Sequence, residues 1–105
     1  MSRAWDLIRA NIAEGQTLRI WAKRDGFGSP FTVRRITPTG VAVEVSSTHK
    51  IRRVSKQDID SVADIWARYC SGAISRRAIT RPDDGSGIVN VSYALGLIKS
   101  IEGSL

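Results

Sequence analysis

Residues 17–54 read TLRIWAKRDGFGSPFTVRRITPTGVAVEVSSTHKIRRV, and this stretch decides the fold. Apolar and polar residues alternate within short runs, which is the period of a β-strand that buries one face. Glycine, proline and serine residues separate the runs and favour turns. The pattern predicts four strands, over residues 17–23, 31–36, 41–45 and 49–54, joined by short connections into an antiparallel meander.

The same alternation predicts which residues share a face of the sheet. In the third strand, Val41, Val43 and Val45 form the buried row. In the second strand, a period of two places Phe31, Val33 and Arg35 on one face, and Thr32, Arg34 and Ile36 on the other. A shift of one residue would exchange Arg34 for Arg35. Residues 25–30 contain two glycines and a proline, so we expect a hairpin turn there.

Helical patterns lie on both sides of this stretch. The spacing of Trp5, Ile8 and Ile12 predicts a helix over residues 3–14 with one apolar stripe. Ser55 can cap a second helix over about 56–71, and Gly72 can end it. A last helix over about 91–102 would turn Leu95, Ile98 and Ile101 inward.

These elements predict one α+β domain spanning residues 1–105. Its centre would be a small, twisted, four-stranded antiparallel sheet or partial barrel, packed with an N-terminal helix and two C-terminal helices. A sheet this small gains stability when helices cover its apolar face. We expect that cover to come from Trp5, Trp66, Leu95 and Ile98.

Composition excludes several classes of protein. The chain has 42% hydrophobic and 25% charged residues, as in globular proteins. One cysteine cannot form an intramolecular disulfide, and with one histidine it cannot complete a tetrahedral zinc site. No apolar run is long enough to span a membrane, and the N-terminus lacks the apolar core of a secretory signal. We therefore expect a cytoplasmic protein with no metal and no cofactor.

Positive charge is concentrated in the predicted strands. Residues 17–54 contain eight cations and two acids, and they account for the whole formal charge of +6. The isoelectric point is about 10.3. Charge gathered on one sheet favours a polyanionic partner, either nucleic acid or an acidic protein, and we do not expect a membrane partner.

The leading hypothesis is a non-enzymatic module that binds, or associates with, nucleic acid through a basic sheet. Its phosphate contacts would be Arg19, Lys23, Arg34, Lys50 and Arg52. Strand alternation places Trp21 between Arg19 and Lys23, where an aromatic ring could stack on a base. The same ring could instead be covered by a helix or lie in a dimer contact.

A second hypothesis is a homodimeric protein-interaction module that recognises an acidic partner. In that case Trp21, Phe27 or Phe31 would be buried between two chains. A helix-turn-helix is a weaker alternative, because the connection from Arg81 to Val89 is longer than the usual turn.

Enzymatic alternatives find less support in the sequence. A metal-free ribonuclease could use His49 as its base, with Arg52, Arg53 and Arg35 stabilising the transition state. Pro82-Asp83 resembles the opening of a metal-dependent nuclease signature, but no Glu-x-Lys follows it. Cys70, on the apolar face of the second predicted helix, is expected to be a small buried hydrophobe.

The last third of the chain resembles a pattern found in small proteins of mobile DNA. The residues that carry the resemblance are GAISRR at 72–77 and NVSYALGLI at 90–98. Such proteins include integron gene-cassette products and accessory modules beside restriction-type nucleases. The resemblance implies a bacterial mobile-element origin and often a homodimer, and it transfers no site residues.

Overall fold

The structure, a computed structural model, describes residues 3–22, 26–73 and 91–104. It confirms the α+β prediction: a four-stranded antiparallel sheet with one N-terminal and two C-terminal helices. The elements in chain order are α1 (Arg3–Asn11), β1 (Thr17–Ala22), β2 (Gly26–Thr37), β3 (Gly40–Val45), β4 (Ile51–Ser55), α2 (Lys56–Ser71), α4 (Val91–Ser100) and the short 3-10 helix η1 (Glu102–Ser104). Lys23 and residues 74–90 lie outside the described part of the chain.

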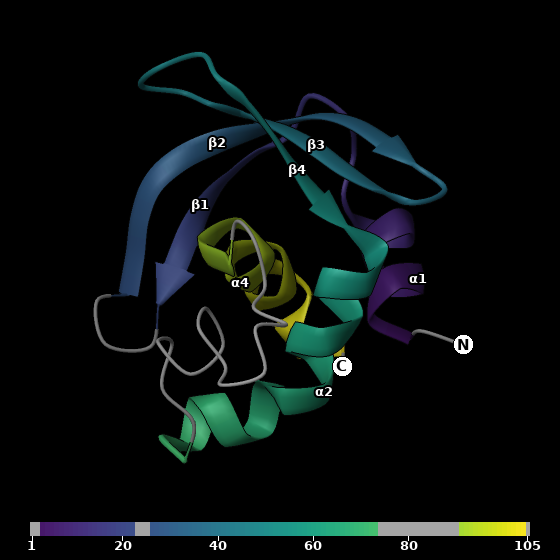
Figure 1. Cartoon of the computed structure of the whole chain (residues 1–105), viewed down its shortest axis with the longest axis vertical. Helices are drawn as coiled ribbons and strands as arrows, with labels where there is room; N and C mark the ends of the chain where they lie inside the picture. Colours follow the sequence, from purple (N-terminus) through teal and green to yellow (C-terminus); the bar gives the residue numbers. More distant parts are fainter. Residues whose placement is uncertain (1–2, 23–25, 74–90, 105) are drawn as a thin grey trace.

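The sheet follows chain order, β1-β2-β3-β4, and is not closed into a barrel. It curls over the helices, with α4 lying inside the curl beside β1, and α1 and α2 on the same side (Figure 1). None of the described helices is long and apolar enough to cross a membrane. Because the helices labelled in Figure 1 lie on one side of the sheet, they cover one of its faces, and the other face is directed away from them.

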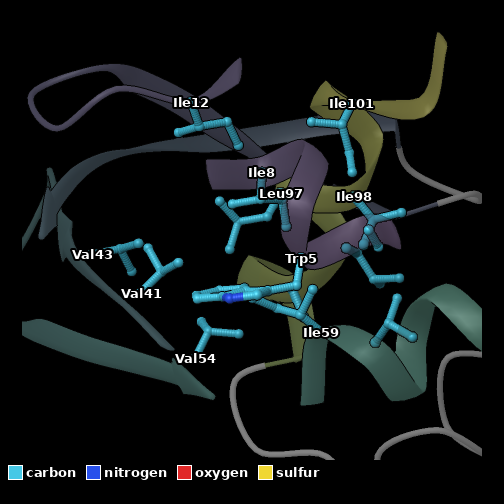
Figure 2. Close-up of a cluster of buried hydrophobic side chains, with 14 of the residues drawn as sticks. Trp5, Ile8, Ile12, Val41, Val43, Val54, Ile59, Leu97, Ile98 and Ile101 are labelled. Carbon is cyan, nitrogen blue, oxygen red and sulfur yellow. The ribbon is translucent and has the colours of Figure 1, made fainter. Parts of the chain in front are cut away.

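The core lies between the sheet and the helices. Figure 2 shows the Trp5 ring of α1 between the valines of β3 and β4 and Ile59 of α2. Among the described residues, no polar or charged residue is buried. The buried hydrophobic residues are Ala4, Trp5, Ile8, Ile12, Phe31, Val33, Val41, Val43, Val54, Ile59, Val62, Trp66, Tyr69, Val91, Ala94, Leu95, Leu97, Ile98 and Ile101.

Helix α2 begins and ends where its capping residues predict. The Asp58 backbone N–H donates to Ser55 Oγ at 3.0 Å, which satisfies one N–H of the first turn. At the other end, Gly72 has a φ of 88° and its N–H bonds back to the last carbonyls of the helix. Between these caps, Trp66 and Tyr69 lie on the buried face of α2 and contact Trp21 of β1.

Close packing of α4 on β1 depends on a glycine. A Cβ on Gly96 would lie 2.5 Å from the backbone oxygen of Arg19 and 3.2 Å from the Phe31 ring. The Tyr93 ring meets Phe31 edge to face, with 5.3 Å between centroids. Gly96 thereby allows a helix backbone to approach the strand that carries two predicted site residues, Arg19 and Trp21.

Strand β2 is longer than the sequence indicates. Residues 26–30, which we expected in a turn, belong to β2, so that prediction is wrong for them. The ladder pairs Phe27 with Trp21 and Pro30 with Arg19, with a register shift between the two pairs. Such a bulge tolerates proline and bends the strand, so here strand pairing outweighs the local turn signal.

A second bulge in β2 changes the predicted faces. Val33 pairs with Val43, but the register then shifts, and Ile36 pairs with Val41 while Arg35 pairs with Ala42. Cross-strand partners share a face, so Ile36 joins the valines on the helix side. The prediction that Arg35 shares a face with Phe31 and Val33 is wrong, because one extra residue resets the alternation.

Candidate nucleic-acid interface

The sheet face turned away from the helices is polar, and we call it the outer face. The residues of the outer face are identified from the cross-strand pairs of the sheet, because two residues paired across neighbouring strands lie on the same face. Its residues are Thr17, Arg19, Thr32, Arg34, Arg35, Ala42, Glu44, Ile51 and Arg53. All four of these arginines are exposed.

Two arginines lie in one row across three strands. Arg35 of β2 and Arg53 of β4 both pair with Ala42 of β3. Adjacent strands are about 4.8 Å apart, so the two Cα atoms are separated by roughly 10 Å. Ala42 is too small to rise between them. The row therefore carries two exposed arginines on the outer face.

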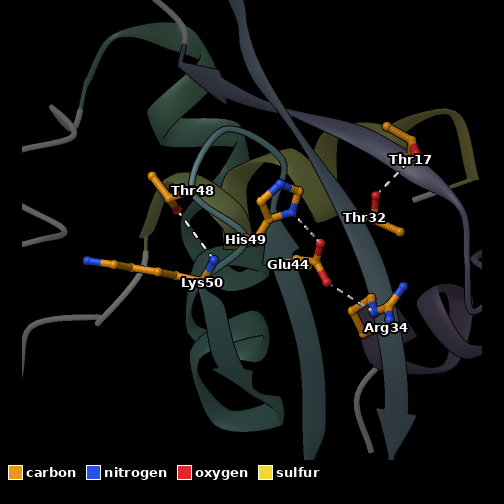
Figure 3. A network of polar contacts seen from close by, with 7 residues as sticks. All are labelled: Thr17, Thr32, Arg34, Glu44, Thr48, His49 and Lys50. Atoms are coloured by element: carbon orange, nitrogen blue, oxygen red, sulfur yellow. Dashed lines mark hydrogen bonds and ion pairs between the residues drawn. The ribbon is translucent and has the colours of Figure 1, made fainter.

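Glu44 is the one acid in the strands that the structure describes. Its Oε1 lies 3.4 Å from Arg34 Nε, and its Oε2 lies 3.1 Å from His49 Nδ1 (Figure 3). The Arg34 side chain is 57% exposed, so this pair contributes little to stability. Its effect is to hold the Arg34 side chain over the outer face.

The other two predicted phosphate contacts that are described, Lys50 and Arg52, are placed differently. Arg52 pairs with Val43, which faces the helices, so the ladder puts it on the other side of the sheet from Arg53. Lys50 precedes β4, and its side chain points away from Glu44 and His49 (Figure 3). Both residues are exposed at the edge strand. The structure thus separates them from Arg19 and Arg34.

Trp21 is engaged by the helices. Its ring centroid lies 5.3 Å from that of Trp66 and 6.0 Å from that of Tyr69, and the Lys99 Nζ lies 4.8 Å from the Trp21 centroid. Trp66 Nε1 donates to Glu102 Oε2 at 3.1 Å, and Lys99 donates to Glu102 Oε1 at 2.7 Å. These contacts join β1, α2, α4 and η1 around a half-buried ring. Of the alternatives considered for Trp21, these contacts match the one in which helices cover its ring.

Phe27 is the exposed aromatic residue beside a predicted phosphate contact. Its side chain is 63% exposed, and with Thr17, Leu18, Arg19 and Pro30 it lines a shallow hollow of about 350 Å³. Arg19 Nη1 donates to the Gly28 carbonyl at 3.1 Å, which orients the guanidinium next to the hollow. An apolar ring and an oriented cation therefore lie together at one end of the sheet.

A second hollow, of about 540 Å³, lies where the β2–β3 turn meets the start of α2. Asp60 and Asp64 are among its lining residues, and Lys56 Nζ lies 3.7 Å from Asp60 Oδ2. Two carboxylates make this hollow a poor place for a polyanion. The outer face and the Phe27 hollow remain the better candidate surface.

The structure also locates the residues of the ribonuclease hypothesis. His49 has a φ of 57°, its side chain is 79% exposed, and it contacts Glu44 on the outer face. Arg52 lies on the other side of the sheet from Arg35 and Arg53. Within the described residues, no three His, Cys, Asp or Glu side chains form a group that could hold a metal ion.

Arg35 and Arg53 are outer-face residues that were not among the predicted contacts. For Arg53 a signal exists in the sequence, since Val54 is the apolar end of β4 and alternation places its neighbour on the opposite face. For Arg35 the decisive feature is the bulge after Val33, which alternation does not reveal.

Comparisons with protein-family models, with curated proteins and with solved structures found no match.

Proposed function

We propose that this protein is a non-enzymatic nucleic-acid-binding module whose outer face contacts phosphates. The observation that carries the proposal is the segregation of charge between sheet and helices. Among the described residues, 17–22 and 26–55 contain six cations and one acid, whereas the remainder contains five cations and six acids. Within the described residues, a polyanion is therefore attracted to the sheet more strongly than to the helices.

The outer face suits phosphate contacts in its chemistry as well as its charge. Arg19, Arg34, Arg35 and Arg53 are its cations. A guanidinium presents several N–H donors in a fixed plane and can bind two phosphate oxygens at once. Phosphate contacts position a ligand without reading its sequence. The proposed module is therefore tolerant of sequence.

The test is the salt dependence of binding to a fluorescein-labelled oligonucleotide of mixed sequence, followed by anisotropy. Four neutralised phosphates predict a slope of log K against log salt of roughly −3 to −4. A slope near zero, or no binding at low salt, would contradict the proposal. Ribonuclease activity that purified protein loses on substitution of His49 by alanine would contradict its non-enzymatic part.

A second candidate is the homodimeric protein-interaction module with an acidic partner. Two large hydrophobic residues of the described chain are exposed, and this favours the second candidate. Phe27 lines a hollow together with Arg19, and Ile51 lies on the same face of β4 as Arg53. Light scattering during size-exclusion chromatography distinguishes the two candidates. A concentration-dependent dimer that oligonucleotide does not disturb would support the second. The mobile-element origin that the C-terminal resemblance implies stays a prediction.

A further inference from the structure

We infer that the hollow lined by Thr17, Leu18, Arg19, Phe27 and Pro30 is a subsite for one unpaired nucleobase, with Phe27 as its stacking platform. The inference rests on the proposed function and adds a preference for single-stranded over double-stranded nucleic acid. It also assigns to Phe27 the role for which the sequence suggested Trp21.

Phe27 has the accessibility that stacking requires. Its side chain is 63% exposed, more than that of any other large hydrophobic residue in the described chain. Solvent-facing phenylalanine costs hydrophobic free energy unless something covers it. Leu18 and Pro30 add apolar surface to the lining, and Thr17 adds a hydroxyl. A flat, largely apolar ligand with polar edges matches this lining.

The two strands approach each other closely beside Phe27. A Cβ at position 28 would lie 2.8 Å from Ile20 Cγ1, so Gly28 lets the two strands come together beside Phe27. The register shift between Arg19 and Trp21 bends the hairpin at the same point. The subsite is thus built on paired strands rather than on a free loop.

Arg19 links the hollow to the outer face. Its Nη1 donates to the Gly28 carbonyl, which leaves the remaining guanidinium donors for a ligand. A nucleotide whose base lay on Phe27 would bring its own phosphate near Arg19. The strand could then continue over the outer face, where Arg34 carries the next cation.

Base accessibility sets the predicted preference. In a duplex, both faces of every internal base are covered by neighbouring pairs, so Phe27 could stack only on an end or on an unpaired base. In a single strand a base can leave its neighbours at lower cost and expose a face, and stacking on aromatic side chains tolerates any base. Phosphate contacts alone would bind both forms.

The experiment compares Phe27→Ala with wild type on a labelled single strand and on the matching duplex at low salt. We expect Phe27→Ala to weaken single-strand binding about 5- to 150-fold and duplex binding less than twofold. Phe27→Trp should restore single-strand affinity, because it restores a stacking ring. Gln57→Ala, which shortens an exposed side chain of α2 away from the outer face, should leave both affinities within twofold.

The other possible results of this experiment separate the base subsite from the proposed function. Unchanged single-strand binding by Phe27→Ala, with a steep salt slope retained, would overturn the subsite and leave the proposed function standing. Equal weakening on both ligands would also overturn it, because a base subsite predicts a difference. If wild type binds neither ligand, the proposed function fails and the subsite fails with it.

Discussion

The Nζ of Lys99 lies 4.8 Å from the ring centroid of Trp21, so the ring that flanks Arg19 in the sequence already contacts a cation of its own chain. Trp66 and Tyr69 meet the same ring from α2. Trp21 therefore links the β1 end of the sheet to the helices. Substitution of Trp21 should lower the stability of the fold more than it lowers nucleic-acid binding.

We expect Trp21→Ala to lower the free energy of unfolding by about 2–3 kcal/mol, below the range for a fully buried tryptophan because this ring is half-buried. Urea unfolding measures the change. Trp21→Phe should recover part of the stability and bind oligonucleotide within about twofold of wild type, since stacking resides at Phe27. Strong loss of binding by a stably folded Trp21→Phe would show that Trp21 itself contacts the ligand.

Glu44 opposes a polyanion on the outer face and pairs with Arg34 at 3.4 Å. Glu44→Gln removes that negative charge and frees Arg34, so affinity for oligonucleotide at low salt should rise about two- to fivefold, the size of a surface charge interaction. Asp64→Asn, on α2, makes the same change of charge away from the outer face and serves as the control. If both variants gain equally, net charge rather than position determines affinity.

Gly96 allows α4 to approach β1 closely, because a Cβ there would lie 2.5 Å from the Arg19 backbone oxygen. Gly96→Ala should therefore destabilise the fold by about 1–3 kcal/mol through overpacking, although alanine favours helix formation. Thermal unfolding monitored by circular dichroism measures this. Gly103→Ala meets nothing within 4 Å and should leave the midpoint nearly unchanged. A stabilised Gly96→Ala would contradict the close approach of α4 to β1.

Ser55 accepts the Asp58 N–H at 3.0 Å and begins α2 directly after β4. Ser55→Ala leaves that donor without its partner and should cost about 0.5–2 kcal/mol, whereas Ser55→Asp should keep most of the stability. Chemical unfolding of the two variants provides the comparison. Equal stability of Ser55→Ala and wild type would contradict the capping role.

The sequence was sufficient for the fold because local patterns and tertiary contacts agree in most elements. Helical spacing placed Trp5, Ile8 and Ile12 in the core, and cap residues marked both ends of α2. Alternation fixed Val41 and Val43 as inward residues. It failed in β2, where two bulges extend the strand through Pro30 and reset the faces after Val33. A bulge depends on strand pairing, which single-sequence alternation does not contain.

The candidate site was less predictable than the fold. Charge in 17–54 indicated the sheet, and Arg19 and Arg34 do lie on its outer face. Which aromatic ring is free, however, depends on what α2 and α4 cover, and that is decided by packing far along the chain. Trp21 and Phe27 are cross-strand partners, yet Phe27 is the one left exposed.

The most direct test of the central claim reverses charge on the outer face and compares it with the edge strand. Arg35→Glu/Arg53→Glu and Lys50→Glu/Arg52→Glu change the formal charge equally, but only the first pair lies beside Ala42 on the outer face. Oligonucleotide affinity is measured for both against salt. The outer-face pair should lose most of the binding and flatten the salt slope by roughly two, while the edge pair loses much less. Equal losses, or a larger loss for the edge pair, would contradict the outer face as the binding surface.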